Sequence, residues 1–437
     1  MSSSNHHLRP VGLFESFHVY RHFLGLDSGP ICAARYTNAD GAVLTKENLF
    51  PALKRVIEEH PSLAVALDAE DSKPVFVKLE KIALDLIVQF TDDKEVEAAI
   101  ENRLSRPFDT SLPLWRVEVL KDGFVVFIFH HAIGDGLSGV AFHQSLLAAL
   151  QNTVLSDGSA VVQVPPSISL QPPIEAVTSL RPSLGKMLYE VFSLFAPSSW
   201  KPLHTAWTGN PVPNNRLLRT HVKLLTFSAE EMANFTKVCR SHGASITSAI
   251  YILAVATASR LVPLNNTPPY KTLSTNVAIS LRDVARTPGT VMCDYVSTHH
   301  TFPTINPAFS WPAAAAYARE LQRQKQGVAR QEIGMLMLLF GNIAGFLRSK
   351  LGQKRGATFE VSNLGRVAAS TEGPWRLGRM IFAQCDSVIG PALKVNVVGD
   401  PSGGLSVCLT WGEEAIEKSL AESFASQFQE GLRALLV

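Results

Sequence analysis

The chain has 437 residues, of which 46% are hydrophobic and 18% are charged, and its formal net charge is +2. This composition is typical of a well-packed globular protein and argues against disorder. The nearly balanced charge argues against nucleic acid as the main partner.

The chain has five cysteines, an odd number, and none of them form a C-x-x-C motif. This pattern indicates reduced thiols in a reducing compartment. Residues 1–10 lack the apolar core of a secretory signal. Residues 333–347 are the most membrane-like stretch, but they are too short to span a bilayer comfortably. We therefore expect a cytoplasmic protein without a transmembrane segment, in which this stretch is a buried helix. An interfacial helix beside the basic residues 348–355 is the alternative.

Strand and helix patterns alternate through the first part of the chain. Residues 31–36 favour a strand, and Thr45 is a good N-cap for a helix with one apolar face. Pro61 ends this helix, because proline disfavours helical geometry at the residue before it. A strand over 117–120, a glycine-containing turn and a strand over 124–129 then predict a hairpin.

The second hairpin strand stops abruptly at HHAIGDG, residues 130–136. The end of a buried strand is rigid while the following loop is accessible, so α/β proteins often carry their chemistry there. A histidine at this point is a candidate general base, because its ordinary pKa lies near neutrality. Side chains alternate along an extended chain, so one of His130 and His131 should face a cleft and the other the interior. Asp135 can brace the loop, and Gly136 leaves room for a sharp turn or a ligand.

Two other interpretations of this stretch stay open. A buried histidine pair satisfied by backbone groups, with Asp135 as the N-cap of the next helix, needs no chemistry. A metal site is less favoured, because adjacent histidines diverge and the sequence has no second cluster with ligand spacing. We therefore predict neither a metal nor a bound cofactor.

The stretch from His130 to Gly136 resembles the signature of the acyl-CoA-dependent acyltransferase superfamily. That group includes chloramphenicol acetyltransferase, plant BAHD enzymes, peptide-synthetase condensation domains and fungal alcohol acetyltransferases, which are the closest match. Further motifs resemble the family in matching order: Arg9, Gly12 and Glu15, then HPSL at 60–63 and PLWRVEV at 113–119. The DFGWG motif of BAHD enzymes is absent, which favours the alcohol acetyltransferase and condensation branches.

The resemblance implies an α/β protein of two chloramphenicol acetyltransferase-like domains, with mixed sheets flanked by helices and the active site at the domain interface. Prolines cluster between the two halves and indicate a crossover. We predict an N-terminal half over 1–175, a crossover over 176–215 with a short helix at 184–195, and a C-terminal half over 216–437.

The second half shows similar local patterns. They predict a strand over 216–227, a helix capped by Ser228, a buried helix over 245–262, strands over 273–279 and 359–366, a hairpin of strands 393–398 and 405–411, and a last helix from about residue 414.

Arg282 follows the strand over 273–279 and is either solvated or paired. The resemblance implies that it pairs with Asp135, and such an Arg–carboxylate pair would lock the loop that carries His131. Asp135 is then structural. The second histidine pair, at 299–300, has no downstream Asp-Gly, so we expect ordinary strand residues there.

The sequence Ser-Asn-x-Gly at the end of the strand over 359–366 provides Ser362, Asn363 and Gly365. Their hydroxyl, amide and flexible backbone suit an oxyanion or a substrate carbonyl. The same residues equally favour an Asx-turn. The resemblance places such a stretch opposite the active-site histidine. We therefore assign to substrate binding or the oxyanion site His130, Gly136, Ser362, Asn363 and Gly365.

The implied reaction is acyl transfer, by default of an acetyl group, from coenzyme A to the hydroxyl or amine of a small molecule, with a secondary metabolite as the expected acceptor. His131 would take the acceptor proton, with acyl-CoA as a co-substrate rather than a bound cofactor. Two alternatives stay open. One is a condensation-type reaction with an acyl-carrier protein as partner, and the other is a non-catalytic relative that binds a metabolite. A monomer is favoured, because each half has enough apolar residues to cover its own core.

Overall fold

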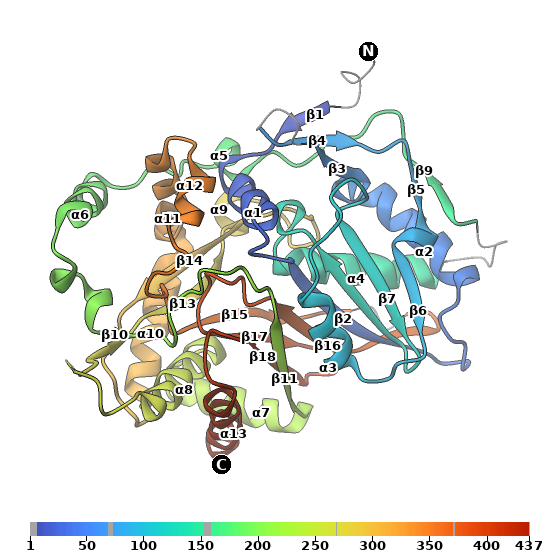
Figure 1. The fold of residues 1–437 in the computed structure, drawn as a ribbon. Helices are drawn as coiled ribbons and strands as arrows, with labels where there is room; N and C mark the ends of the chain where they lie inside the picture. Colours follow the sequence, from blue (N-terminus) through green and yellow to red (C-terminus); the bar gives the residue numbers. More distant parts are fainter. Residues whose placement is uncertain (1–6, 69–72, 153–158, 268, 370–371, 437) are drawn as a thin grey trace.

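The computed structural model describes the whole chain except residues 1–6, 69–72, 153–158, 268, 370–371 and 437. Two mixed sheets form its centre and helices pack around them, so the predicted α/β class is confirmed (Figure 1). Among the described residues, three small sheets of two or three strands complete the β structure.

The first sheet has five strands, in the order β16 (Trp375–Gln384), β2 (Pro30–Asn38), β8 (Phe124–Phe129), β7 (Trp115–Leu120) and β6 (Val88–Thr91). β7 and β8 form the predicted hairpin. Helices α2 (Lys46–Glu59) and α4 (Gly136–Gln151) pack on one face of β8, and α3 (Val96–Leu104) packs on the other. This burial on both faces explains why all six residues of β8 are apolar.

The second sheet has six strands, in the order β11 (Thr220–Phe227), β18 (Leu405–Gly412), β17 (Leu393–Gly399), β15 (Phe359–Arg366), β13 (Thr275–Ser280) and β14 (Val296–Thr301). β13, β15 and β17 are parallel, and the other pairs are antiparallel. Helices α8 (Ile246–Leu261) and α13 (Lys418–Ala434) share an apolar core with this sheet. Side chains on its other face meet helix α1 (Leu13–Phe23) and the end of β8 around a cavity.

The remaining α-helices are α5 (Ile174–Val177), α6 (Leu184–Phe195), α7 (Ala229–Ser241), α9 (Arg282–Ala285), α10 (Trp311–Arg323), α11 (Arg330–Gly334) and α12 (Ile343–Arg348). The small sheets pair β1 (His7–Pro10) and β3 (Val65–Asp68) with β4 (Val75–Lys78), β5 (Lys81–Ala83) with β9 (Val161–Gln163), and β10 (Ala206–Trp207) with β12 (Thr272–Leu273). The predicted N-caps are present, because Thr45 precedes α2 and Ser228 opens α7 with a capping box. Two predicted boundaries shift, since β11 begins at Thr220 and α13 begins at Lys418.

Strand β16 joins the two parts of the chain. It belongs by sequence to the predicted C-terminal half, yet it extends the first sheet beside β2, with Ile381 opposite Ala33. A strand exchanged in this way ties the halves together over the cavity. The division of the chain at residues 175 and 215 stays a prediction.

The prediction of one buried helix over 333–347 is wrong. This stretch contains the end of α11, a 3-10 helix (Met335–Leu339) and the start of α12. The break lies at Phe340 and Gly341, which have φ values of 47° and 83°. Glycine adopts positive φ easily and so ends a helix, and the side chain of Asn342 then caps α12. Phe340 is 92% exposed at this break.

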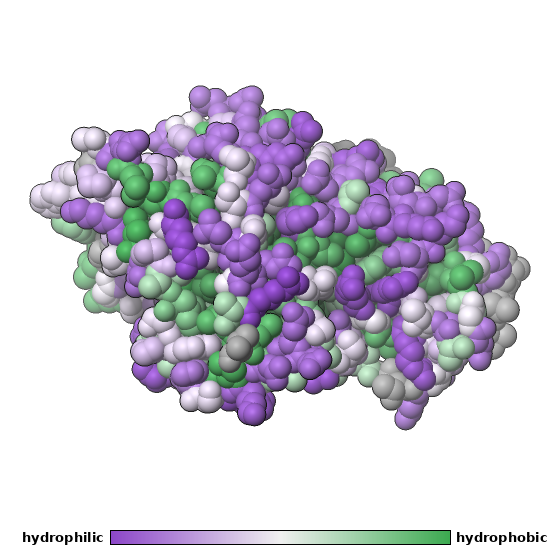
Figure 2. Space-filling view, turned by 90° about the horizontal axis from the view of Figure 1, so that it is seen from below, coloured by the Kyte–Doolittle hydropathy of each residue, from purple (hydrophilic) through white to green (hydrophobic). Residues whose placement is uncertain are grey.

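Helix α6 coincides with the helix predicted at 184–195 and lies at the edge of the molecule (Figure 1). Its apolar side chains Leu188, Phe192 and Phe195 are exposed. Hydrophilic side chains cover most of the face shown in Figure 2, and hydrophobic ones gather there in smaller patches. Among the described helices, none is by itself long and apolar enough to cross a membrane; α7 and α8 meet that criterion only as a pair bent by 91°.

Candidate active site

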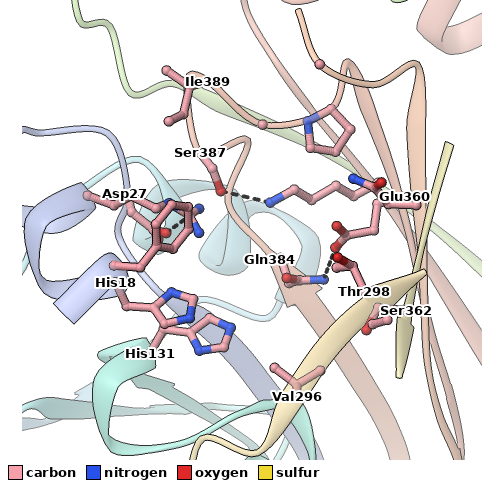
Figure 3. Close-up of a pocket in the computed structure, with 18 of the residues that line it drawn as sticks. His18, Asp27, His131, Val296, Thr298, Glu360, Ser362, Gln384, Ser387 and Ile389 are labelled. Atoms are coloured by element: carbon pink, nitrogen blue, oxygen red, sulfur yellow. Dashed lines mark hydrogen bonds and ion pairs between the residues drawn. The ribbon is translucent and has the colours of Figure 1, made fainter. Parts of the chain in front are cut away.

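A cavity of about 490 Å³ lies between the two sheets, beside α1 and the carboxyl end of β8. Figure 3 shows the rings of His18 and His131 at one side of this cavity, with Thr298, Glu360 and Ser362 across from them. The second sheet presents alternate residues to the cavity. In β15 these are Glu360 and Ser362, as the two-residue period of a strand requires.

His131 is held from behind by a buried carboxylate. Its Nδ1 atom lies 3.4 Å from Oδ1 of Asp294, whose side chain is fully buried. The other ring nitrogen, Nε2, is then the one available to a substrate in the cavity that His131 lines. A carboxylate beside Nδ1 favours the tautomer with its proton on that atom, and it stabilises the imidazolium.

Asp294 also contacts a second imidazole. Helix α1 contributes His18, whose Nε2 lies 3.3 Å from Oδ2 of the same carboxylate. The His18 and His131 rings are stacked, with centroids 3.8 Å apart and planes 4° from parallel. The Asp294 carboxylate therefore contacts both stacked histidines, one from α1 and one from the turn after β8.

The charges of these three groups depend on one another. Burial is the largest single influence on the pKa of His131 and lowers it, but the Asp294 carboxylate and then Asp27 raise it, and the net shift is upward. Burial and then the charge of His131 lower the pKa of His18 well below its ordinary value. Burial raises the pKa of Asp294 to about 6. The directions of these shifts make His131, rather than His18, the ring that holds a proton beside the Asp294 carboxylate.

The ion pair that the resemblance implied between Asp135 and Arg282 is present, and both side chains are buried. Asp135 Oδ2 also accepts a hydrogen bond from the Tyr295 N–H, at 3.2 Å. Arg282 Nη2 donates to the Cys293 carbonyl at 3.2 Å, and the Asp135 N–H donates to the same carbonyl at 3.1 Å. The pair therefore holds residues on both sides of Asp294, and it fixes this carboxylate against the loop of His131.

Asp135 is also the N-cap of the following helix, the role that the sequence analysis left as an alternative. Its side chain accepts a hydrogen bond from the Ser138 N–H at 3.2 Å and is the N-cap of α4. Gly136, the first residue of this helix, lines the cavity. A Cβ at this position would lie 2.5 Å from Cδ2 of Leu364 and 3.0 Å from Cζ of Phe382. A side chain at this position would therefore press on Leu364 and Phe382.

Of the three residues assigned from Ser-Asn-x-Gly, only Ser362 reaches the cavity. Asn363 points to the other face of β15, where its Nδ2 donates to Thr247 Oγ1 at 3.0 Å. Its Oδ1 accepts from the Gly365 N–H at 2.8 Å, which is the Asx-type contact that the sequence left as an alternative. The two-residue period of the strand is the reason, because Ser362 and Asn363 cannot face the same side.

His130 does not reach the cavity either. It is buried, and its Nδ1 accepts a hydrogen bond from the Ala132 N–H at 3.0 Å. Its ring packs against His22 and Phe108, with centroids 4.8 Å and 6.5 Å away. The expected divergence of the two neighbouring histidines is therefore present, and it turns His130 away from the substrate.

The sequence analysis missed His18 and Asp294. A signal for His18 exists, because the buried stripe of α1 contains Glu15, His18 and His22 at helical spacing. Buried polar side chains need hydrogen-bond or ion-pair partners, so a row of them is unusual on a helix that only packs against a hydrophobic core. Asp294 has no local signal, since it lies in an irregular segment before β14.

His18, His131 and Asp294 place their ligand-type atoms within 4.8 Å of one another. Metal binding requires the in-plane lone pairs of both imidazoles to converge on one ion. The two rings are nearly parallel and stacked at 3.8 Å, so their lone pairs run side by side. The geometry suits a bridging carboxylate better than a shared metal.

Two curated proteins resemble the chain over almost their whole length. The chain is 24% identical to the probable alcohol acetyltransferase FCK4 of Fusarium pseudograminearum, over 98% of this chain and 95% of that protein. It is also 24% identical to the probable alcohol acetyltransferase crmB of Aspergillus fumigatus, over 96% and 97%.

Solved structures share the fold. A trichothecene 15-O-acetyltransferase from Fusarium sporotrichioides matches with a TM-score of 0.71 at 13% identity, over 98% of this chain and 94% of that one. The epimerization domain of tyrocidine synthetase B matches with a TM-score of 0.62 at 14% identity, over 100% and 98%. The family model described as alcohol acetyltransferase matches residues 11–432. The chain therefore belongs to the alcohol acetyltransferase family, a family of acyltransferases.

Proposed function

We propose that this protein transfers an acyl group, by default acetyl, from coenzyme A to a hydroxyl or amine of a small molecule bound in the cavity. One observation carries the proposal. His131 lines the cavity, while its Nδ1 faces the buried carboxylate of Asp294 at 3.4 Å. An imidazole held in this way is a general base whose free nitrogen faces the substrate.

The proposed reaction proceeds through a tetrahedral intermediate. Nε2 of His131 takes the proton of the acceptor hydroxyl while the oxygen attacks the thioester carbonyl, and Asp294 stabilises the imidazolium that forms. The carbonyl oxygen becomes an oxyanion, for which the Ser362 hydroxyl on the facing wall is a candidate donor. The intermediate then collapses and breaks the carbon–sulfur bond. The coenzyme A thiolate leaves and receives the proton from His131.

The donor is either free acyl-CoA or an acyl group on a carrier protein. Both donors present a phosphorylated arm. Lys350 and Lys354, from the basic stretch 348–355, line the cavity and supply positive charge for such a phosphate. Membership of the alcohol acetyltransferase family favours free acyl-CoA, and the carrier-bound donor is the alternative to be tested.

The test measures thiol release from a panel of acyl-CoAs mixed with alcohols and amines, for the wild type and His131→Ala. Loss of the general base should reduce transfer by about 10²- to 10⁴-fold. His242→Ala, which removes an exposed ring stacked on Trp311, is the matched control and should keep wild-type activity. Unchanged transfer by folded His131→Ala would overturn the mechanism. Turnover with carrier-bound acyl groups but not with free acyl-CoA would identify the carrier protein as the donor and leave the general-base mechanism in place.

A further inference from the structure

The cavity wall contains a buried cation that the reaction described above does not use. Strand β17 carries Lys394, which lines the cavity and is only 4% exposed. Its ammonium donates to the Cys385 carbonyl at 2.6 Å and to Ser387 Oγ at 2.8 Å, the second of which is drawn in Figure 3. An ammonium has three donors, so these two contacts leave one N–H for another partner.

The ion pairs within 4 Å among the described residues include none with Lys394. Burial raises the pKa of Asp386 to about 6, and the charge of Lys394 opposes this shift, so Lys394 acts on that carboxyl without a direct contact. Glu360 is the direct neighbour of Lys394 across the β15–β17 pair, but that carboxylate accepts a hydrogen bond from Gln384 Nε2 at 3.4 Å. Asp27 is paired with Arg21 at 2.5 Å. Burial raises the pKa of Asp27, but the charges of Arg21 and then Lys394 outweigh it and lower that pKa, so the positive charge of Lys394 acts across the cavity wall. A buried ammonium without a direct carboxylate contact makes the folded state less stable, and such groups concentrate at binding sites.

The loop between β16 and β17 has a separate anchor. Ser387 and Val388 both have positive φ, 61° and 44°, a strained conformation for residues other than glycine. Arg355, which is fully buried behind the loop, donates from Nη1 to the carbonyls of Val388 and Gly390, each at 2.7 Å. Because Arg355 holds the loop from behind, Lys394 is not required as its only cationic anchor.

We propose that Lys394 and Ser387 form a subsite for a carboxylate group of the substrate. The inference rests on the proposed acyl transfer and extends it to the class of molecule that the cavity accepts. The third N–H of Lys394 is free for one oxygen of a carboxylate. The Ser387 hydroxyl accepts from Lys394 at 2.8 Å and donates to the Cys385 carbonyl at 3.4 Å, and by rotating it can donate to the other oxygen instead. The bound carboxylate gives Lys394 a direct ion-pair partner. The favoured substrate is therefore an acceptor that carries a carboxylate besides its hydroxyl or amine, such as a hydroxy acid or an amino acid.

The test compares acids with their neutral esters. Lactate with methyl lactate and mandelate with methyl mandelate serve as acceptors for acetyl-CoA, with the wild type and Lys394→Met. The wild type should prefer the acid in at least one pair. Lys394→Met should raise the KM for that acid by about 10- to 100-fold, as expected for one lost hydrogen bond to a charged group, and change the KM for its ester less than about twofold.

Two controls separate charge recognition from other roles. Lys354→Met removes another cation of the cavity wall, which is assigned above to the donor phosphate. It should raise the KM for acetyl-CoA and leave the acid-to-ester preference unchanged. Arg355→Met loosens the loop and should affect acid and ester alike. A second arm compares malonyl-CoA with acetyl-CoA on neutral acceptors. Loss of a malonyl preference in Lys394→Met would keep the carboxylate subsite and assign it to the acyl group instead.

The remaining outcomes overturn the subsite. An equal fall in kcat for acid and ester in Lys394→Met would make Lys394 an oxyanion or loop residue. A wild type that distinguishes neither acids from esters nor malonyl from acetyl groups would also contradict it. Calorimetric titration with mandelate gives a readout without turnover. Binding that is lost in Lys394→Met would support the subsite even if acyl transfer failed, and no binding by the wild type in any of these assays would overturn it.

Discussion

His131 and Asp294 contact each other at 3.4 Å although one follows a strand of the first sheet and the other precedes a strand of the second. The contact gives the HHxxxDG histidine a carboxylate partner other than the aspartate of its own motif. Asp135 is occupied with Arg282 and with the start of α4. The aspartate of the motif therefore holds the loop, and Asp294 acts on the imidazole.

Asp294→Asn tests this division of roles. The substitution keeps the size of the side chain and removes its charge, so we expect kcat/KM to fall by about 10²-fold or more. Burial lowers the pKa of His131, but Asp294 and then Asp27 raise it, so the net shift is upward. The reaction needs neutral His131, so activity should rise with pH through this pKa. Without the carboxylate the pKa falls, and the acidic limb of the pH–rate profile should move to lower pH. A limb that stays in place would contradict the assignment.

His18 should act as a positioning residue. Its ring stacks on His131 at 3.8 Å and its Nε2 contacts Asp294. His18→Ala removes both contacts, and we expect kcat to fall about tenfold, within the range for a misplaced catalytic group. His18→Phe keeps an aromatic ring beside His131 and should recover part of this loss. Circular dichroism checks that both variants are folded. Their steady-state kinetics then show whether the stacked ring contributes to kcat. Equal loss in both would assign the effect to the contact with Asp294.

The Asp135–Arg282 pair should be important for stability. Both side chains are only 4% exposed, so removing one partner leaves a buried charge without compensation. Arg282→Met and Asp135→Asn should each lower the free energy of unfolding, by up to about 3–5 kcal/mol for the variant that leaves a full charge. The double variant should be more stable than the sum of the single losses predicts. Urea denaturation of the four proteins measures this coupling, and additive losses would argue against a direct pair.

Gly136 should determine the width of the cavity. In Gly136→Ala the new Cβ would lie 2.5 Å from Leu364 Cδ2 and 3.0 Å from Phe382 Cζ, so both side chains must move. We expect a rise in acceptor KM and a loss of stability of about 1–3 kcal/mol. Gly185→Ala on α6 is the matched control, because no atom lies within 4 Å of its added Cβ. Steady-state kinetics and thermal unfolding of the two variants check the prediction, and equal behaviour of both would contradict it.

Local patterns predicted much of the fold. The apolar run of β8, the capping box before α7 and the hairpin of β17 and β18 depend on residues close together in sequence, so their signals survive without tertiary information. The prediction of one helix over 333–347 was wrong because the break at Phe340 and Gly341 depends on where the chain must turn. Apolar content alone cannot show such a turn.

The sequence by itself determined the family resemblance and the position of His131 after a buried strand. The pairing of Asp135 with Arg282 was expected only through that resemblance. Only the tertiary structure decided which other groups meet His131. His18 and Asp294 lie in segments far apart along the chain, and they converge because α1 and the segment before β14 pack on the same loop. The phase of β15 turned Ser362 inward and Asn363 outward. Such contacts are set by packing between distant elements, whose register no local pattern encodes.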